Sequence, residues 1–115
     1  MKNKKIIDTV KELTNYFPFE NYLVDNGIVR PKYFYITNLI YKKFGKDKKI
    51  LDFGSGLNDL SAILKKLEFN IDAYDDCNDE WYKENNNLLK LREFNEKINL
   101  KFYETIEELK LSNNK

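Results

Sequence analysis

A turn with two glycines, set between an apolar run and a helical pattern, constrains the fold of this chain more than any other feature. Residues 49–53 are apolar and bounded by charge and glycine, as a short buried parallel strand is. Gly54-Ser55-Gly56 follows directly, and leucines at helical spacing come next. A second apolar run, residues 69–74, ends in acid. The order strand, tight turn, helix and second strand predicts a parallel βαβ unit.

Two helical patterns precede this unit. Apolar residues at helical spacing predict one helix that stops before Pro18 and a second that runs from Pro31 to Gly45. The chain therefore divides into an N-terminal helical segment, residues 1–46, and a domain built on the βαβ unit, residues 47–115.

The pattern continues after the second strand. A polar segment, residues 75–87, leads into a helix with apolar positions at 88, 91 and 94, and residues 98–103 make a third strand. Residues 105–109 predict one short helical turn, and the polar tail 112–115 is expected to fray. The fold class is α/β: two N-terminal helices, then a parallel sheet of three strands in the order β-α-β-α-β, with helices on its faces.

Composition narrows the possible partners. The 115 residues suffice for one domain, and 20 basic against 19 acidic side chains leave a net charge of +1. This balance predicts neither a nucleic-acid nor a membrane surface. Cys77 is the sole cysteine and histidine is absent, so no metal site is expected, and the early acid Asp8 interrupts any signal-peptide core. We expect a cytoplasmic protein that binds a small molecule.

The glycine turn and the acid after the second strand suit a nucleoside. Gly54 and Gly56 lack a Cβ atom, so a ligand can approach the backbone closely. Asp75 follows Gly54 by 21 positions, where a strand-end carboxylate accepts the hydroxyl protons of a ribose. Two alternatives stay open: the glycines serve only a tight βα turn, and Asp75 with Asp76 caps a helix.

The residues that follow the glycine turn indicate whether the nucleoside ligand carries phosphate groups. A dinucleotide-binding turn has a third glycine three residues after the second, and this chain has Asp59 there. A carboxylate at that position repels a pyrophosphate at the helix N-terminus. No Gly-Lys-Ser/Thr follows the turn either, which excludes a P-loop. A nucleoside without phosphate remains.

At this point the residues resemble the class I S-adenosylmethionine-dependent methyltransferases. The run Ile50-Leu51-Asp52-Phe53-Gly54-Ser55-Gly56 is similar to their first motif, and Asp75 to the ribose-binding acid of their second. The resemblance implies that the cofactor is S-adenosylmethionine, that the turn with Ser55 lies against its methionine portion, and that Asp76 lies near its adenine. It implies that Asp52 orders the methionine end. Asn58 stands where the family usually has a further glycine.

The resemblance covers residues 48–111 and implies an incomplete Rossmann-like sheet. Complete family members continue into a fourth strand where this chain ends, so residues 47–115 are expected to be a truncated cofactor-binding domain with an open sheet edge. Such an edge predicts a homo-oligomer or a second chain that covers it. We expect a methyltransferase-like domain, a fragment or remnant acting on a small molecule or saccharide, with no catalytic residue assigned and activity of the chain alone left open. The alternative is a non-catalytic nucleoside-binding or assembly module that works with a partner chain.

Other residues near these motifs have two interpretations each. Arg30, Tyr33 and Tyr35 either cover the cofactor carboxylate or serve packing and solvation, of which we favour the second. Trp81 and Tyr82 either stack on the ligand or pack against the sheet.

Overall fold

Three parallel strands form the centre of the structure. The computed structural model describes residues 1–113. The strands β3 (Ile50–Phe53), β4 (Ile71–Tyr74) and β5 (Phe102–Tyr103) lie side by side in that order. β3 and β4 pair along their whole length, and β5 pairs with the second half of β4. The predicted α/β class and the three-stranded parallel sheet are confirmed.

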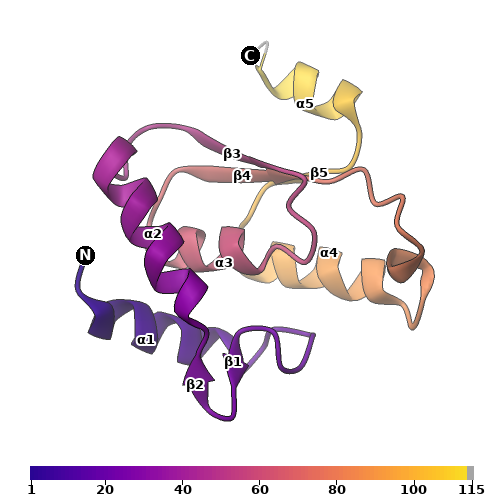
Figure 1. Ribbon diagram of the computed structural model, residues 1–115. Helices are drawn as coiled ribbons and strands as arrows, with labels where there is room; N and C mark the ends of the chain where they lie inside the picture. Colours follow the sequence, from indigo (N-terminus) through magenta and orange to yellow (C-terminus); the bar gives the residue numbers. More distant parts are fainter. Residues whose placement is uncertain (114–115) are drawn as a thin grey trace.

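The two crossover helices cover one face of the sheet (Figure 1). They are α3 (Asp59–Lys66) and α4 (Asn87–Lys97), each between two strands. Ala62, Ile63 and Leu64 of α3 are fully buried, as are Leu91 of α4 and Ala73 of β4. Burial of these apolar side chains is what holds the helices on the sheet.

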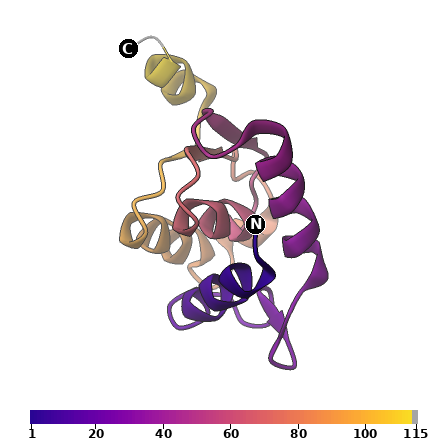
Figure 2. The same ribbon diagram turned by 90° about the vertical axis from the view of Figure 1, so that its left-hand side faces the viewer.

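The N-terminal segment packs beneath this helix layer (Figures 1 and 2). Helix α1 (Asn3–Leu13) buries Ile6, Val10 and Leu13 completely, and these residues belong to the same apolar core as α3 and β4. The rings of Phe17 and Phe94 meet edge to face with centroids 5.1 Å apart. Residues 1–46 are therefore held by one core together with the sheet and its helices.

Helix α2 (Pro31–Phe44) delivers the chain to β3 as predicted. Pro31 occupies its first turn, where the missing N–H costs nothing. Gly45 ends it with φ of 68°. Before α2, β1 (Val24–Asp25) and β2 (Ile28–Val29) form a small antiparallel hairpin that was not predicted, with Asn26 and Gly27 in the turn between them.

The C-terminal elements differ from the prediction in length. β5 is shorter than the strand expected at 98–103 because Ile98 ends α4. Helix α5 (Ile106–Asn113) is longer than the turn expected at 105–109 and takes in part of the expected frayed tail. Thr105 explains its start: its Oγ1 accepts the N–H of Glu108 at 3.1 Å as an N-cap does, and its hydroxyl donates to the Glu108 carboxylate at 3.2 Å. Residues 114 and 115 lie outside the described part.

The second face of the sheet is bare over its edge strand β3, whereas Asp72 and Tyr74 of β4 are buried on it. Within residues 1–113, α5 is the one helix over this face, near β5 (Figure 1), so the predicted helix cover is extensive on one face and limited to α5 on the other. Leu51 and Phe53 of the edge strand β3 are 40% and 65% exposed. Within residues 1–113, no helix is long and apolar enough to cross a membrane.

Candidate functional site

The glycine turn joins β3 to α3 through three left-handed residues. Gly54, Gly56 and Asn58 have φ of 79°, 58° and 60°. Glycine adopts this region freely, and asparagine tolerates it better than most side chains do. Asn58 thus supplies the backbone conformation that the resemblance expects from a further glycine. A Cβ atom at Gly54 or Gly56 would meet no atom within 4 Å, so the space beside them is open.

The backbone amides of this turn are bonded within the protein. The N–H groups of Gly54 and Ser55 both donate to the carbonyl of Tyr74, at 2.8 and 2.9 Å. These bonds fix the turn to the end of β4. The turn is therefore anchored to β4, and the N–H groups of Gly54 and Ser55 are already occupied by the Tyr74 carbonyl.

Asp75 lies directly against the turn. Its Oδ2 accepts the N–H of Gly56 at 2.8 Å, and its Oδ1 accepts the N–H of Cys77 at 2.9 Å. A carboxylate offers about four acceptor positions, so two remain for a ligand. The two backbone bonds hold the carboxylate in place at the end of β4, where it faces a cavity.

This cavity, about 480 Å³ in volume, is called the nucleoside cavity after the ligand predicted for it from the sequence. The volume is within the range of small-molecule sites. Acidic and aromatic side chains dominate its lining, and within residues 1–113 no lysine or arginine lines it. The lining consists of Tyr22, Gly56, Leu57, Asp75, Asp76, Asp79, Trp81 and Tyr82.

Aromatic residues form one wall of the nucleoside cavity. They are carried by the 3₁₀ helix η1 (Glu80–Lys83), which Asp79 caps by accepting the N–H of Trp81 at 2.9 Å. The ring centroids of Trp81 and Tyr82 lie 5.1 Å apart. The Phe19 ring of the N-terminal segment packs on Trp81, with the two centroids 4.9 Å apart. The Tyr82 hydroxyl donates to the Gly56 carbonyl at 3.2 Å. The two rings therefore pack on each other and on the N-terminal segment, not on the sheet, and they line the cavity. Stacking on a ligand stays a prediction.

The protonation of Tyr82 follows from its surroundings. Burial first, and then the negative charge of Asp75, raise the pKa of its hydroxyl above the ordinary tyrosine value. Tyr82 therefore remains a neutral donor at neutral pH.

Asp52 and Ser55 lie outside the nucleoside cavity. Asp52 is half-buried and accepts the hydroxyl of Ser61 on α3 at 2.6 Å. Burial raises its pKa, although the Ser61 bond opposes this. Ser55 is buried, and its hydroxyl has no hydrogen-bond partner within the described residues. Of the six predicted site residues, Gly56, Asp75 and Asp76 meet at the cavity, Gly54 and Ser55 support the turn, and Asp52 faces the helix layer.

Asn58 and Asp59 connect the turn to other elements. Asn58 is fully buried and donates to the side chain of Asn95 on α4 at 3.1 Å. Asp59 begins α3 and accepts the Tyr33 hydroxyl at 2.5 Å, with the Lys32 ammonium 3.8 Å away. The Asp59 carboxylate thus points to the N-terminal segment. Tyr33 is buried at this junction, which agrees with the packing role favoured for it.

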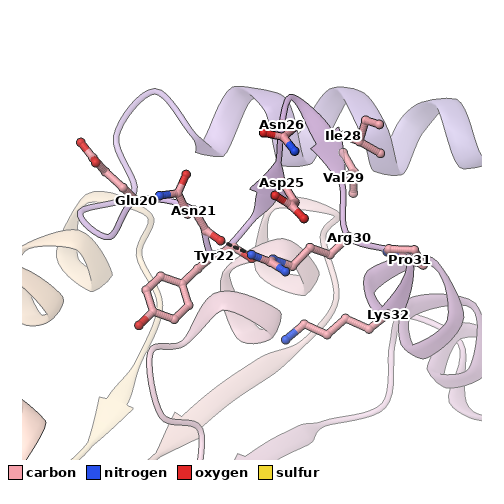
Figure 3. Close-up of a pocket in the computed structure, with 10 residues that line it drawn as sticks. All are labelled: Glu20, Asn21, Tyr22, Asp25, Asn26, Ile28, Val29, Arg30, Pro31 and Lys32. Atoms are coloured by element: carbon pink, nitrogen blue, oxygen red, sulfur yellow. Dashed lines mark hydrogen bonds between the residues drawn. The ribbon is translucent and has the colours of Figure 1, made fainter.

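A second cavity, about 850 Å³ in volume, lies beside the β1–β2 hairpin and is called the hairpin cavity below. Figure 3 shows Arg30 and Lys32 extending across it from the start of α2. Arg30 donates from Nε to the Tyr22 carbonyl at 2.8 Å and from Nη2 to the Asn21 carbonyl. Tyr22 lines both cavities, so the two adjoin at this side chain.

Some residues lie elsewhere than the sequence predicted, and others line the cavity without having been predicted. Tyr35 is 71% exposed on α2 and lines neither of the two cavities. Tyr22, Leu57 and Asp79 line the nucleoside cavity but were not predicted. Asp79 carried a weak signal, since aspartate is a favoured N-cap residue. Tyr22 carried none, because only the packing of the N-terminal segment brings it there.

Comparisons of this chain with protein-family models, curated proteins and solved structures find no significant match. Its function is therefore argued from the site.

Proposed function

We propose that the chain binds S-adenosylmethionine in the nucleoside cavity, as a methyltransferase-like cofactor-binding domain. The observation that carries this proposal is Asp75, whose carboxylate is fixed by Gly56 and Cys77 with two acceptor positions left. The two adjacent hydroxyls of a ribose are donors that match these positions. The half-buried Trp81 ring lines the cavity and offers a face for a base, with the buried Tyr82 packed beside it.

The charge of the nucleoside cavity supports a ligand without phosphate. Asp75, Asp76 and Asp79 line it, and no cation among the described residues does. Three carboxylates repel a nucleotide phosphate and attract positive charge. S-adenosylmethionine has a neutral nucleoside and a cationic sulfonium, so its charge is complementary to this lining. The open space at Gly56 leaves room for its chain along the turn.

When bound, S-adenosylmethionine supplies an electrophilic methyl group to a nucleophilic acceptor. The residues of this chain hold and orient the nucleoside, and the aromatic wall excludes water from it. We assign no catalytic base: the chain has no histidine, and an acceptor that is already deprotonated needs none.

A second candidate is a non-catalytic nucleoside-binding or assembly module that works with a partner chain. The observation that favours it is the edge strand β3, where Leu51 and Phe53 are exposed beside an unpaired strand edge. This candidate differs from the first in that binding of S-adenosylmethionine is not required for its role.

Isothermal titration with S-adenosylmethionine and S-adenosylhomocysteine tests the proposal. We expect saturable binding of both at millimolar concentration or below, and weaker binding of ATP because of the three carboxylates. Absence of binding for both sulfur compounds would contradict the proposed function and leave the assembly module. ATP that binds more tightly than either would show that the cavity is a nucleotide site.

A further inference from the structure

The hairpin cavity combines a fixed positive charge with hydroxyl acceptors. Two bonds to the carbonyls of Asn21 and Tyr22 hold the Arg30 guanidinium in place. Carbonyls do not neutralise it, and among residues 1–113 no carboxylate forms an ion pair with Arg30. A positioned guanidinium without a counterion at a cavity wall is a site for an oxyanion.

Lys32 adds a second positive charge to the same wall. Its ammonium lies 3.8 Å from Asp59, whose Oδ2 already accepts the Tyr33 hydroxyl at 2.5 Å. The Lys32 side chain is exposed and its separation from the partly buried Asp59 carboxylate is long, so this ion pair holds Lys32 weakly. Figure 3 shows the Lys32 and Arg30 side chains running in the same direction, with their charged ends on the same side of the cavity.

The remaining polar lining excludes a bare anion. Glu20 and Asp25 also line the cavity, and a ligand with only negative charge would be repelled by them. Their carboxylates, with the amides of Asn21 and Asn26, are instead acceptors for hydroxyl groups. A ligand that matches both the two cations and the acceptor groups of this cavity has one anionic group and several hydroxyls.

We propose that the hairpin cavity binds a small hydroxylated acid, with its carboxylate or phosphate on Arg30 and Lys32, and that this molecule is the methyl acceptor. The second half rests on the proposed function. The position supports it, because Tyr22 separates the hairpin cavity from the nucleoside cavity. An acceptor in one cavity therefore lies next to a cofactor in the other.

Chemical-shift titration of the ¹⁵N-labelled full chain tests the proposal. The probes are glucuronate, glucose 6-phosphate and glucose, each added with and without S-adenosylhomocysteine. We expect one or both acids to shift the amides of residues 21–30 and Lys32 and the Arg30 Nε–H, and glucose to leave them unchanged. The two acids distinguish a carboxylate ligand from a phosphate ligand. Equal shifts with glucose, or no shifts with either acid, would overturn the proposal.

The variant Lys32→Gln removes one charge and leaves both Arg30 bonds to the loop. We expect it to weaken binding of the acid by roughly tenfold, the effect of one charge-assisted hydrogen bond. Lys42→Gln, on the same helix but outside the cavity, is the matched control and should change nothing. An unchanged affinity in Lys32→Gln would contradict the site.

The two proposals can fail separately. Acids that bind while S-adenosylhomocysteine does not would leave the hairpin site standing and contradict the proposed function. If Lys32→Gln weakens S-adenosylhomocysteine but not 5′-methylthioadenosine, which lacks the amino-acid end, the cavity holds the cofactor's own carboxylate. That result would overturn the acceptor assignment.

Discussion

The Gly56 N–H and the Asp75 carboxylate form a hydrogen bond of 2.8 Å that joins the ends of two neighbouring strands. Gly56 follows β3, and Asp75 follows β4. The bond places an acid that is 19 residues distant in sequence against the glycine turn. The nucleoside cavity opens at this junction, and the proposed function depends on it.

Replacing Asp75 should weaken binding of S-adenosylhomocysteine. In Asp75→Ala the hydroxyls of the ribose lose their acceptor, which costs about 1–3 kcal/mol of binding free energy. Isothermal titration measures the change. Asp47→Ala, an exposed acid in the turn before β3, is the control. Equal affinities of Asp75→Ala and the unaltered chain would mean that Asp75 does not contact the ligand.

Gly56→Ala distinguishes the effect of Gly56 on folding stability from its effect on ligand binding. A Cβ here meets no protein atom, so the cost to folding comes only from φ of 58° and is about 1 kcal/mol. The added methyl group projects into space that we assign to the ligand, so affinity for S-adenosylhomocysteine should fall as well. Gly27→Ala, with φ of 78° in the hairpin, should show the folding cost alone. Parallel urea unfolding and titration test this, and an unchanged affinity in Gly56→Ala would place the ligand elsewhere.

The Tyr33 hydroxyl should make folding stability fall at alkaline pH. Burial and the bond to Asp59 raise the pKa of Tyr33 in the folded state. The stabilisation is complete below the unfolded value, about 10, and is lost as the pH rises above it. Tyr33→Phe should lower the free energy of unfolding by about 1 kcal/mol at neutral pH and reduce its decline at high pH. Urea unfolding at several pH values tests this, with the exposed Tyr35→Phe as control; an identical pH profile in Tyr33→Phe would contradict the account.

Cys77 should be an unreactive thiol in the folded protein. Burial, with the negative charges of Glu104 and Asp75, raises its pKa from 9.0 to about 12. Because the thiolate is the reacting form, alkylation near pH 8 should be much slower than in the urea-unfolded chain. Iodoacetamide labelling followed by mass spectrometry measures both rates. Equal rates would show that the thiol is accessible and not perturbed.

The edge strand β3 should pair with a second copy of the chain. The N–H groups of Ile50 and Gly54 point toward β4, so the alternating backbone groups of Leu51 and Phe53 face outward. Lysines precede β3 and aspartates follow β4, so an antiparallel arrangement of two copies brings opposite charges together. Light scattering should detect a dimer that Phe53→Lys dissociates, whereas Tyr35→Lys should not. A monodisperse monomer at high concentration would contradict self-pairing.

The sequence predicts the sheet better than the elements around it, and for physical reasons. The β3–turn–α3 unit can be predicted because the apolar run, the glycines and the helical spacing in residues 49–67 all indicate the same strand, turn and helix. The hairpin strands have two residues each, too few for any periodicity. Helix α5 begins at the N-cap Thr105, and the Thr-x-x-Glu pattern that Thr105 forms with Glu108 is a local sequence signal for a helix start.

The candidate site was predictable only where it is local in sequence. Gly56 and Asp75 were identified from the turn and the strand end. Tyr22 reaches the nucleoside cavity because Phe19 packs on Trp81 and the N-terminal segment shares the core, and no local pattern encodes this contact. The bonds from the Gly54 and Ser55 amides to Tyr74 likewise depend on how β3 and β4 end together.

A chemical-shift titration of the ¹⁵N-labelled chain with S-adenosylhomocysteine tests the central claim most directly. The account predicts saturable shifts centred on the amides of Gly56, Leu57 and Asp75 and on the Trp81 indole N–H, with small shifts on the bare face of the sheet. An unchanged spectrum at millimolar ligand, or shifts confined to residues outside the nucleoside cavity, would contradict it.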